Sequence, residues 1–567
     1  MTVYDTPLIL GSPRFASSHK TQPATSTDRA DQAAAWRTVG PDQVATVTGN
    51  FAVGMHEADG RSWIAVDRFG IESICWRVVD GKLRFAARAD DLVDGDAEID
   101  PQAIYDYLYF HVIPSPRTIF KGVYRLPPGH VAIFEHGEVS VKPYWQPTFE
   151  APRETSFDAL AVEFRQLLRD SVEAQLDGSK PGCFLSGGTD SSTVAGLLGE
   201  VSDQQAATFS IGFDAQGYDE MAFARIAAQQ FKTEHHEYYV TPDDLVRSIA
   251  KVASHFDQPF GNSSALPAYY CAKMAHEHGM TRLLAGDGGD ELFGGNSRYA
   301  KDRIFGWWGL LPSGLRTAAL EPLLEGQRAS GIGLLRKTAS YAEQASVPMP
   351  DRQQMYNLLL RLGADNVLTP ALLAQVDQAA PLAQQRTVWS SSSSVNASAL
   401  NKQLAYDWRY TLAESDLPKV RGATQLAGVG VGYPLLDDRL LAFSCKLPDA
   451  YKLKGLKLRW FFKEALRGLL PEEIIKKKKQ GFGLPFGVWA NGHDGLKAIA
   501  RESLHGIAER GVVRRDFVDE LLKKRLPEYP GYYGEMVWIL MMLEQWLRAK
   551  APNFRIDPAG RKVISAR

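Results

Sequence analysis

The sequence predicts an α/β fold in which a β-rich N-terminal domain precedes a larger domain built on a doubly wound parallel sheet. From residue 156 onward, short apolar strands alternate with amphipathic helices, which is typical of a parallel sheet covered on both faces. Residues 40–150 carry closely spaced strand patterns and hairpin turns instead. A polar, proline-bearing stretch at 147–155 separates the two patterns. We therefore predict two domains, 1–150 and 151–567.

Size and charge limit the classes of function. A chain of 567 residues can bury two cores, and a formal net charge of −2 gives no overall attraction to nucleic acid or to a membrane surface. No apolar run is long enough to cross a bilayer, and no secretory signal precedes the first domain. The four cysteines form no CxxC pair, so neither a zinc site nor a disulfide framework is expected. We expect a cytoplasmic protein without nucleic-acid or membrane partners.

In the N-terminal domain, apolar runs bounded by turn residues predict the strands. Asp80-Gly81 and Glu135-His136-Gly137-Glu138 are expected hairpin turns. Asp100 before Pro101 predicts a helix start, because this pair suits the cap and the first turn. The predicted strands are residues 43–55, 62–67, 82–87, 131–134 and 139–141.

In the second domain, apolar residues recur at helical spacing between the short strands. Pro527 and Pro530 are expected to separate two C-terminal helices. The predicted strands are residues 183–185, 207–211, 236–240 and 282–285, and the predicted helices include one that begins at Ser192 and those at 220–231, 243–256, 266–278, 517–526 and 536–547.

The strongest motif is the string Ser186-Gly187-Gly188-Thr189-Asp190-Ser191-Ser192 between a predicted strand and a predicted helix. Glycines let the backbone approach a ligand, and serine hydroxyls with free N–H groups at a helix start bind phosphate oxygens. Asp190 can hold the accompanying divalent ion. The string resembles the pyrophosphate loop of ATP pyrophosphatases, and it lacks the Gly-Lys-Ser/Thr ending of a kinase P-loop. The alternative is a glycine turn that binds nothing.

A second acidic loop, Gly286-Asp287-Gly288-Gly289-Asp290-Glu291, follows the last predicted strand. In a doubly wound sheet, ligands bind beyond the carboxyl ends of the strands, where both loops belong. Magnesium favours one or two protein carboxylates together with phosphate oxygens. We therefore expect Asp190 and Asp290 to hold Mg²⁺ on ATP. The alternative is an Asx-type turn with capping acids.

Two further segments are candidates for the same site. The strand end that carries Ser210, Gly212 and Phe213 could receive adenine through unpaired backbone groups, although it could equally be an ordinary core strand. Among the lysines 476–479, which as a charge run are expected to be mostly solvated, Lys479 beside a glycine turn is the one expected to stabilise phosphate charge in the transition state.

Together these motifs resemble the asparagine synthetase superfamily. Tyr433-Pro434-Leu435-Leu436-Asp437 belongs to the same pattern, while Gly49 to Ala52, Asp67 to Ile71 and Arg125 to Gly129 resemble its glutamine amidotransferase domain. The resemblance implies an N-terminal nucleophile (Ntn-type) αββα sandwich followed by an ATP-pyrophosphatase domain with added C-terminal helices. It also implies Mg-ATP-dependent adenylation of a carboxylate, attack by an amine, and release of AMP and pyrophosphate.

Departures from the family pattern narrow the expected activity. Position 2 is Thr2, where glutaminase activity in the family needs a cysteine, so we expect neither glutaminase activity nor an ammonia tunnel. Gly430 and Gly432 stand where members that make asparagine or β-lactams carry a glutamate and an arginine, which implies a more open and less charged acceptor pocket. The subgroup most similar in these respects is the lasso-peptide cyclases. They close a macrolactam between a peptide's N-terminal amine and an Asp or Glu side chain.

Three hypotheses follow. The first is a peptide cyclase whose partners are a precursor peptide and a precursor-processing protease. The second is a small-molecule amide ligase, either β-lactam synthetase-like or an ammonia-using asparagine synthetase. The third is a non-catalytic scaffold, which the two intact loops disfavour.

Overall fold

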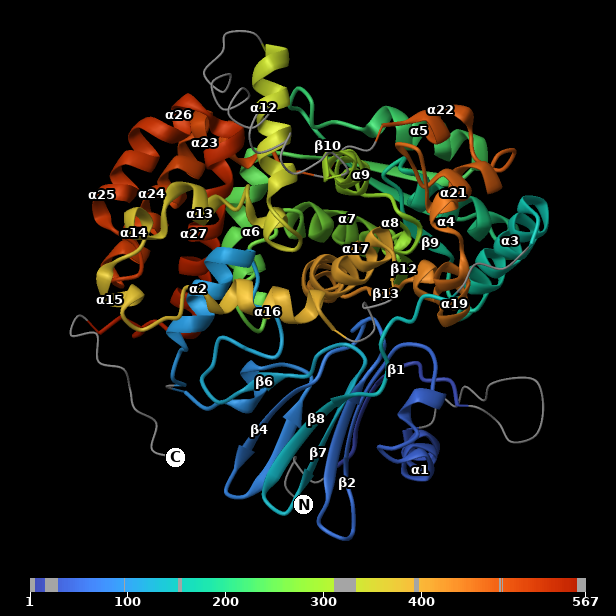
Figure 1. Ribbon diagram of the computed structural model, residues 1–567, viewed down its shortest axis with the longest axis horizontal. Helices are drawn as coiled ribbons and strands as arrows, with labels where there is room; N and C mark the ends of the chain where they lie inside the picture. Colours follow the sequence, from blue (N-terminus) through green and yellow to red (C-terminus); the bar gives the residue numbers. More distant parts are fainter. Residues whose placement is uncertain are drawn as a thin grey trace.

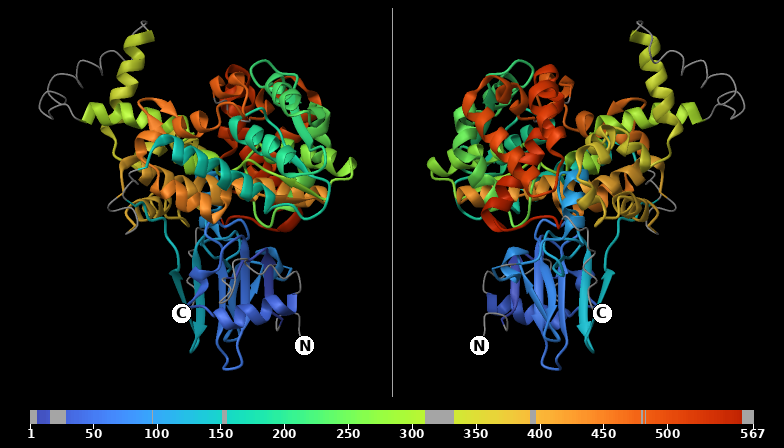
Figure 2. Two further views of the ribbon diagram at one scale, coloured as in Figure 1. Left: turned by 90° about the vertical axis from the view of Figure 1, so that its right-hand side faces the viewer. Right: turned by 90° about the vertical axis from the view of Figure 1, so that its left-hand side faces the viewer.

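The computed structural model describes residues 6–15, 29–95, 97–150, 155–309, 333–391, 397–478, 481 and 483–557. The molecule has two lobes, with the N-terminal lobe set below the larger one (Figures 1 and 2). Within the described ranges, every helix is too short or too polar to traverse a lipid bilayer.

Two sheets and a helix form the layers of the N-terminal lobe. Helix α1 (Arg29–Val39) covers the outer face of the larger sheet, where Trp36 packs on Phe51 and Trp63 at ring distances of 5.0 and 6.1 Å. The other face packs on the smaller sheet through Ile64, Leu83 and neighbouring apolar residues. The larger, antiparallel sheet has the order β1 (Leu8–Gly11), β2 (Phe51–His56), β3 (Ser62–Val66), β7 (His130–Glu135), β8 (Glu138–Pro143), and the smaller one β5 (Lys82–Ala86), β4 (Cys75–Val79), β6 (Tyr124–Arg125).

Helix α2 (Pro101–Phe110) connects the lobes. Its start is as predicted, because the Asp100 side chain accepts a hydrogen bond from the Gln102 amide at 2.9 Å. Its apolar residues join the core of the larger lobe, and Tyr107 donates to the carbonyl of Ile539 at 2.9 Å. Helix α2 therefore ties the N-terminal lobe to the core of the larger lobe, while the two sheets of the N-terminal lobe keep hydrophobic clusters of their own.

A five-stranded parallel sheet organises the larger lobe, which confirms the predicted doubly wound α/β fold. Helices α4 (Thr189–Val201) and α5 (Met221–Phe231) pack on one face, and α7 (Ala265–Glu277) packs on the other with α18 (Leu417–Ala427) against it. The order reverses around β9, whose neighbours are β10 on one side and β12 on the other. The strand order is β11 (Glu234–Val240), β10 (Ala207–Phe213), β9 (Gly182–Phe184), β12 (Arg282–Leu284), β13 (Gly430–Gly432).

Three local predictions were wrong in detail. Helix α4 begins at Thr189 rather than Ser192, so Asp190 lies in its first turn. Pro527 lies within the helical run, at the start of α26 (Leu526–Glu528), rather than breaking it, and Pro530 opens the next helix, α27 (Pro530–Lys550), because proline is compatible with the first helical position. Residues 43–55 contain the 3₁₀ turn η1 (Val44–Thr46) before the strand begins at Phe51.

Most of the remaining elements belong to the larger lobe, and η2 (Asp90–Leu92) packs on strands β4 and β5 of the N-terminal lobe. They are η2 (Asp90–Leu92), α3 (Phe157–Glu173), α6 (Pro242–His255), α8 (Gly289–Phe293), α9 (Ser297–Gly309), α12 (Gly333–Ser346), η4 (Asp351–Gln354), α13 (Leu358–Leu362), α14 (Ala364–Val367), α15 (Pro370–Leu373), α16 (Ala380–Trp389), α17 (Ala399–Asp407), the π-helix η6 (Trp408–Asp416), η7 (Pro434–Leu436), α19 (Asp438–Lys446), α20 (Asp449–Lys452), β14 (Leu453–Lys454), β15 (Lys457–Leu458), α21 (Trp460–Ala465), α22 (Glu472–Lys476), α23 (Phe486–Gly492), α24 (Asp494–Glu509), α25 (Arg515–Glu520), the π-helix η8 (Leu521–Arg525) and α26 (Leu526–Glu528).

Candidate active site

The two glycine-rich loops meet at the reversal of the strand order. Strands β9 and β12 are neighbours, with Leu284 opposite Cys183, so the loops that follow them leave the same edge of the sheet side by side. A Cβ on Gly286 would lie 2.8 Å from the Ser191 amide nitrogen, and one on Gly289 would collide with the Asp190 carboxylate. Glycine is therefore required at both positions for the loops to approach this closely.

The first loop is held closed by its own serines. Ser191 Oγ accepts from the Ser186 amide at 3.1 Å and lies 3.0 Å from Ser186 Oγ, which in turn accepts from the Gly188 amide at 3.3 Å. Gly187 has φ of +65°, and a Cβ there would collide with the Phe223 backbone. The buried hydroxyl of Ser192 has no partner among the described residues. The loop thus presents amides and hydroxyls at the start of α4, as a phosphate cradle needs.

A narrow pocket opens between this loop and β10. Ser210 lines it and donates to the carbonyl of Leu185, which fixes the end of β10 against the loop. The other two adenine candidates lie differently: Phe213 packs into the core against Trp489 at 6.0 Å, and Gly212 lies under the ring of Tyr239. The described residues lining the pocket are Leu185, Ser186, Ser210, Ile211, Tyr218, Glu220, Met221, Ala224 and Gly481.

Asp190 and Asp290 come together around one guanidinium. Arg459 Nη1 donates to Asp190 Oδ1 at 2.5 Å, and Nη2 donates to Asp190 Oδ2 at 2.6 Å and also to Asp290 Oδ1. The described residues hold no group of three or more His, Cys, Asp or Glu that could bind a metal alone. Two adjacent carboxylates nevertheless fit Mg²⁺ that arrives with phosphate oxygens, since this ion usually takes one or two protein carboxylates in such sites.

Asp287 faces a lysine rather than the phosphate loop. Burial raises the pKa of Asp287 to about 6, although Lys419 opposes this rise. Lys419 Nζ lies 4.0 Å from Asp287 Oδ1 and donates to Asp416 Oδ1 at 2.8 Å. Burial disfavours its charge, but Asp416 and Asp287 outweigh that effect and raise the pKa of Lys419 to about 12. Asp416 ends the π-helix η6, a rare element that is frequent at functional sites.

The second loop is anchored by packing. Gly288 has φ of +101°, and a Cβ there would collide with the Leu436 side chain. Glu291 in the following turn is buried, which raises its pKa well above the ordinary value. The less charged acceptor pocket expected from Gly430 and Gly432 stays a prediction. Those glycines form the edge strand β13 instead, where a Cβ on Gly432 would lie 2.5 Å from Gln175 Oε1.

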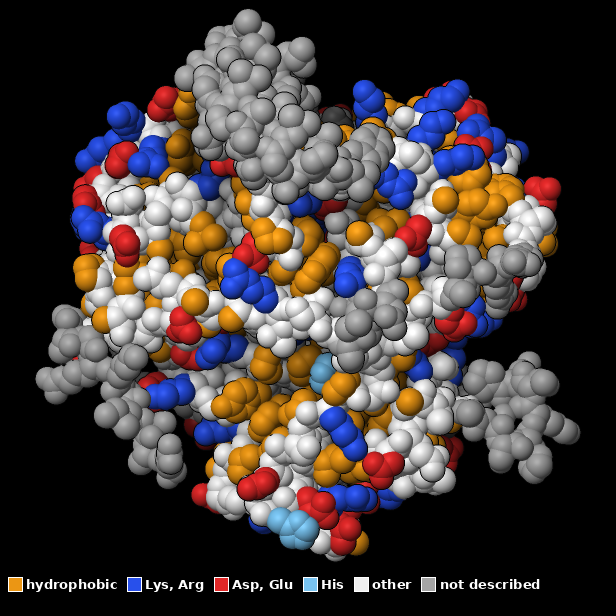
Figure 3. All heavy atoms as spheres, in the orientation of Figure 1, with side chains coloured by type: hydrophobic (Ala, Val, Ile, Leu, Met, Phe, Trp, Pro, Cys, Tyr) orange, Lys and Arg blue, Asp and Glu red, His pale blue; other side chains and the backbone are white. Residues whose placement is uncertain are grey.

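One lysine of the predicted charge run reaches the loop. Lys477 Nζ lies 3.4 Å from the carbonyl oxygens of Ser186 and Gly187 and 3.2 Å from Glu220 Oε2, and its side chain is 8% exposed. Burial lowers the pKa of Lys477, although Glu220 opposes this. Lys476 is 74% exposed, and basic side chains gather over α22 in Figure 3. Lys479, the predicted catalytic lysine, lies outside the described residues, as does Thr2.

The Tyr433 to Asp437 motif holds the lobes together. Asp437 caps α19 and pairs with Arg14 of the N-terminal lobe at 3.3 Å. Its neighbour Asp438 pairs with Arg68 at 2.8 Å and accepts from the Gly49 amide at 2.7 Å. This motif therefore serves domain docking.

Sequence reasoning missed Arg459, Lys419, Asp416 and Lys477. None stands in a glycine-rich loop, and each reaches the site from an element far from the two motifs in the chain. Arg459 has an unusual backbone conformation, with φ of +51° just before α21, but this conformation is visible only in the structure. Without coordinates, only Lys477 stands out, as a member of the lysine run, and no feature distinguishes the other three residues from ordinary surface charges.

Comparison with known proteins agrees with this geometry. A family model described as asparagine synthase matches residues 163–548, and one described as glutamine amidotransferase domain matches residues 16–145. Asparagine synthetase [glutamine-hydrolyzing] 1 of Bacillus subtilis is 28% identical over 493 residues, covering 85% of this chain and 74% of the relative. A putative asparagine synthetase of Mycobacterium tuberculosis is 26% identical over 79% of this chain and 69% of its own length. Putative asparagine synthetase 2 of Methanocaldococcus jannaschii is 36% identical over 206 residues, 35% of this chain and 38% of the relative.

Proposed function

The chain belongs to the asparagine synthase family and is an ATP-dependent, amide-forming carbon–nitrogen ligase, and within this class we propose that it acts on a peptide, joining an Asp or Glu side chain to the N-terminal amine. The family uses ATP with Mg²⁺. The observation that carries the adenylation chemistry is the meeting of the two glycine loops, with Asp190 and Asp290 around one guanidinium. We assign Ser186 to Ser192 to the pyrophosphate and the pocket beside Ser210 to adenine.

The support for an amine supplied by the substrate comes from the N-terminal lobe. The only cysteine in residues 1–150 is Cys75. It is fully buried, and burial raises its pKa to about 12. A thiol nucleophile has to be ionised and accessible, so Cys75 is unsuited to releasing ammonia from glutamine. A precursor-processing protease that exposes the peptide's N-terminal amine is the partner this chemistry requires.

The proposed reaction has two displacement steps. A carboxylate oxygen of the substrate attacks the α-phosphorus of ATP, an acyl–O–P link forms, and the α–β phosphoanhydride bond breaks as pyrophosphate leaves. The amine then attacks the acyl carbon, the C–N bond forms, the C–O bond to AMP breaks, and the nitrogen gives up a proton.

Side chains of this protein take defined parts in both steps. Asp190 and Asp290 would hold Mg²⁺, which offsets the charge of the phosphates. Arg459 and Lys477 supply fixed positive charge beside the departing pyrophosphate. Asp287 is the proposed proton acceptor, because it is ionised above pH ~6 and held by Lys419.

The test measures pyrophosphate release with ATP, Mg²⁺ and one substrate at a time. With a peptide that has a free N-terminus and an internal Asp or Glu, we expect pyrophosphate to be released from ATP and the mass of the peptide to fall by one water. Its N-acetylated form should still support ATP–pyrophosphate exchange, because only the second step is blocked. The Asn or Gln form of the peptide should support neither.

A second candidate function uses the same adenylation chemistry with different substrates. This candidate is asparagine formation from aspartate and ammonium, and it is favoured because the relatives are named as glutamine-hydrolyzing asparagine synthetases. If aspartate with ammonium supports turnover while candidate peptides do not, the peptide proposal fails. Formation of glutamate from glutamine would likewise contradict the loss of glutaminase activity.

A further inference from the structure

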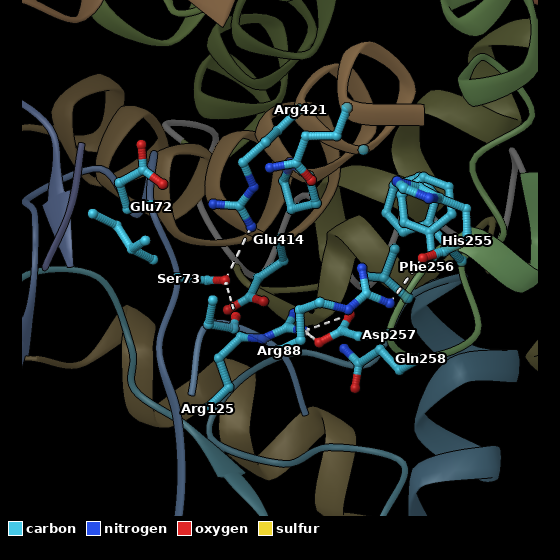
Figure 4. Close-up of a pocket in the computed structure, with 17 residues that line it drawn as sticks. Glu72, Ser73, Arg88, Arg125, His255, Phe256, Asp257, Gln258, Glu414 and Arg421 are labelled. Atoms are coloured by element: carbon cyan, nitrogen blue, oxygen red, sulfur yellow. Dashed lines mark hydrogen bonds and ion pairs between the residues drawn. The ribbon is translucent and has the colours of Figure 1, made fainter. Parts of the chain in front are cut away.

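A cavity of about 200 Å³ between the two lobes borders one face of the helix that η6 and α18 form together. Much of the opposite wall belongs to the N-terminal lobe, and Figure 4 shows Arg421 of α18 directed across the junction toward Ser73 of that lobe. Because the cavity leaves this face without close apolar packing, the contacts at its rim fix the position of the helix. The residues of the helix that line the cavity recur at helical spacing: Glu414, Pro418, Arg421, Gly422 and Gln425.

Arg421 makes the first contact with the N-terminal lobe. It donates to the Ile71 carbonyl at 2.5 Å and to Ser73 Oγ at 3.1 Å. Ser73 in turn donates to the Ala87 carbonyl at 3.0 Å, so the guanidinium binds a segment that is itself fixed. The donors of a guanidinium form a rigid fork, and two acceptors at once therefore hold this part of the helix in one geometry.

Ser115 makes the second contact, at Glu414 in the π-helix. Glu414 Oε1 accepts from the Ser115 amide at 3.1 Å and from its hydroxyl at 2.7 Å. Arg409, five residues earlier, donates to the same carboxylate oxygen, to the Ser115 carbonyl at 2.6 Å and to its hydroxyl at 2.8 Å. Glu414 and Ser115 are both buried. The N-terminal lobe therefore completes a buried ion pair of η6, and such a pair depends on the hydrogen bonds that satisfy its remaining groups.

The opposite face of the same helix carries the charges that lie beside Asp287. Asp416 and Lys419 follow Glu414 by two and five residues, which places them away from the face that lines the cavity. Lys419 Nζ donates to Asp416 Oδ1 at 2.8 Å and lies 4.0 Å from Asp287 Oδ1. A rotation or shift of the helix therefore changes the distance between Lys419 and Asp287.

We propose that the N-terminal lobe positions the acceptor side of the site through this helix. Ser73 and Ser115 are the positioning residues, and they act through the helix that holds Lys419 in place. The inference rests on the proposed function, since it takes Asp287 as the proton acceptor of the amide-forming step. Neither serine contacts a group assigned to ATP, so adenylation should not depend on them. The lobe thus has a part in the second step, although Cys75 is unsuited to glutaminase chemistry.

The experiment uses the full chain with Ser73→Ala, Ser115→Ala and the double variant, none of which changes a charge. The kcat of amide formation should fall roughly tenfold in each single variant and on the order of 10²-fold in the double variant, the size expected for a misplacement of ~1 Å. The rate of ATP–pyrophosphate exchange and the KM for ATP should stay within about twofold of wild type. Ser140→Ala, on the exposed strand β8, is the matched control and should equal wild type in both reactions. An equal loss of exchange and of amide formation would mean a merely structural role and overturn the inference.

The pH profile of amide formation reports the position of Lys419. Burial raises the pKa of Asp287, Lys419 lowers it, and Asp416 and Asp190 raise it further, with a net pKa of about 6. Tyr433 also faces Asp287 but stays neutral, because burial raises its own pKa well above the ordinary value. If the double variant lets Lys419 withdraw, the pKa of Asp287 rises and the acidic limb of the profile should move to higher pH. A limb that stays at its wild-type pH in the double variant would contradict the inference.

Hydrogen exchange separates a failure of this inference from a failure of the proposed function. Backbone amides of residues 408–421 should exchange roughly fivefold to tenfold faster in the double variant, whatever the acceptor, because hydrogen bonds that hold the helix are lost. If aspartate with ammonium is turned over and peptides are not, the same comparison is made with those substrates, and only the peptide proposal fails. Should the double variant not fold, Arg421→Lys, which keeps the charge but lacks the guanidinium fork, takes its place. Unchanged protection of residues 408–421 in the folded variant would refute the positioning role.

Discussion

Buried charges at the carboxyl edge of the parallel sheet and at the junction of the two lobes are arranged differently. At the sheet edge, six acids face only three bases: the acids are Asp190, Glu220, Asp287, Asp290, Glu291 and Asp416, and the bases are Arg459, Lys419 and Lys477. At the junction, three ion pairs match one to one: Arg14 with Asp437, Arg68 with Asp438 and Arg125 with Asp257. The first region carries surplus negative charge and the second carries almost none.

The difference between the two regions is reflected in the pKa values of their buried acids. Burial raises the pKa of Asp287 to about 6, whereas Asp257 keeps a pKa below its ordinary value because Arg125 and the Ala89 amide outweigh the effect of burial. Surplus buried charge is unfavourable unless a cation compensates it. A region that keeps such a surplus is suited to receive a cation from solution, while a region of matched pairs is suited to hold two surfaces together.

The largest effect on activity should come from neutralising one of the excess acids at the sheet edge. Asp190→Asn or Asp290→Asn should lower ATP–pyrophosphate exchange on the order of 10³-fold, because each removes a proposed metal ligand. Raising the Mg²⁺ concentration should restore part of the rate. The exposed acid Asp158 in the first turn of α3 gives the control Asp158→Asn, which should match wild type. Full exchange in both site variants would contradict the metal assignment.

Arg459 tests whether the base between the acids is structural or functional. Arg459→Ala should lower exchange by ~10²–10³-fold, as expected when one charge-stabilising donor is lost. Arg459→Lys should recover only part of the rate, since a lysine cannot fork between two carboxylates. The thermal midpoint should fall in Arg459→Ala if the guanidinium mainly compensates the two adjacent acids. A stable variant with normal exchange would show that Arg459 takes no part in the site.

The proposed role of Asp287 can be tested through the pH dependence of amide formation. Because Asp287 has to be ionised to accept a proton, amide formation should fall as pH decreases through about 6, while ATP–pyrophosphate exchange should be less affected. Asp287→Asn should lower amide formation by ~10²-fold and remove this acidic limb. An unchanged limb in Asp287→Asn would assign the titration to another group.

The comparison also explains what the sequence could predict. Both glycine loops and most of the parallel sheet were predictable, since strand, glycine turn and helix start are local in the chain. The short edge strand Gly430–Gly432 was not, because two glycines around one valine carry no strand pattern and pair only through β12. Likewise the motif identified Asp437 without indicating its role, which depends on Arg14 more than 400 residues away.

The site was predictable where ligand groups follow one another along the chain. Ser186 to Ser192 and Asp290 are such groups. Arg459 and Lys419 come from helical segments without a motif, so only the tertiary fold brings them to the loops. The choice of lysine within residues 476–479 rested on a neighbouring glycine. The described structure brings Lys477 to the loop, and the assignment of Lys479 stays a prediction.

Lys476 and Lys477 form a matched pair for a smaller effect. Lys477→Met should raise the KM for ATP by roughly tenfold, because it removes a positive charge fixed beside the phosphate loop by Glu220. Lys476→Met should change nothing measurable, since its partner Glu472 lies in solvent and exposed pairs contribute little. Equal effects of the two substitutions would mean that Lys477, like Lys476, is a solvated lysine without a role at the phosphate loop.

The smallest effect should appear at the junction, where charges are matched. Arg68→Met removes an ion pair with Asp438 and hydrogen bonds to the carbonyls of Val47 and Ala45, so it should lower the free energy of unfolding by about 1–3 kcal/mol. The exchange rate of the folded protein should stay within about twofold of wild type, since Arg68 contacts no group of the proposed site. Lys82→Met on the exposed β4–β5 hairpin is the stability control. A large loss of exchange in folded Arg68→Met would mean that the matched pairs at the junction also set the geometry of the sheet edge, and the separation of docking charges from binding charges would fail.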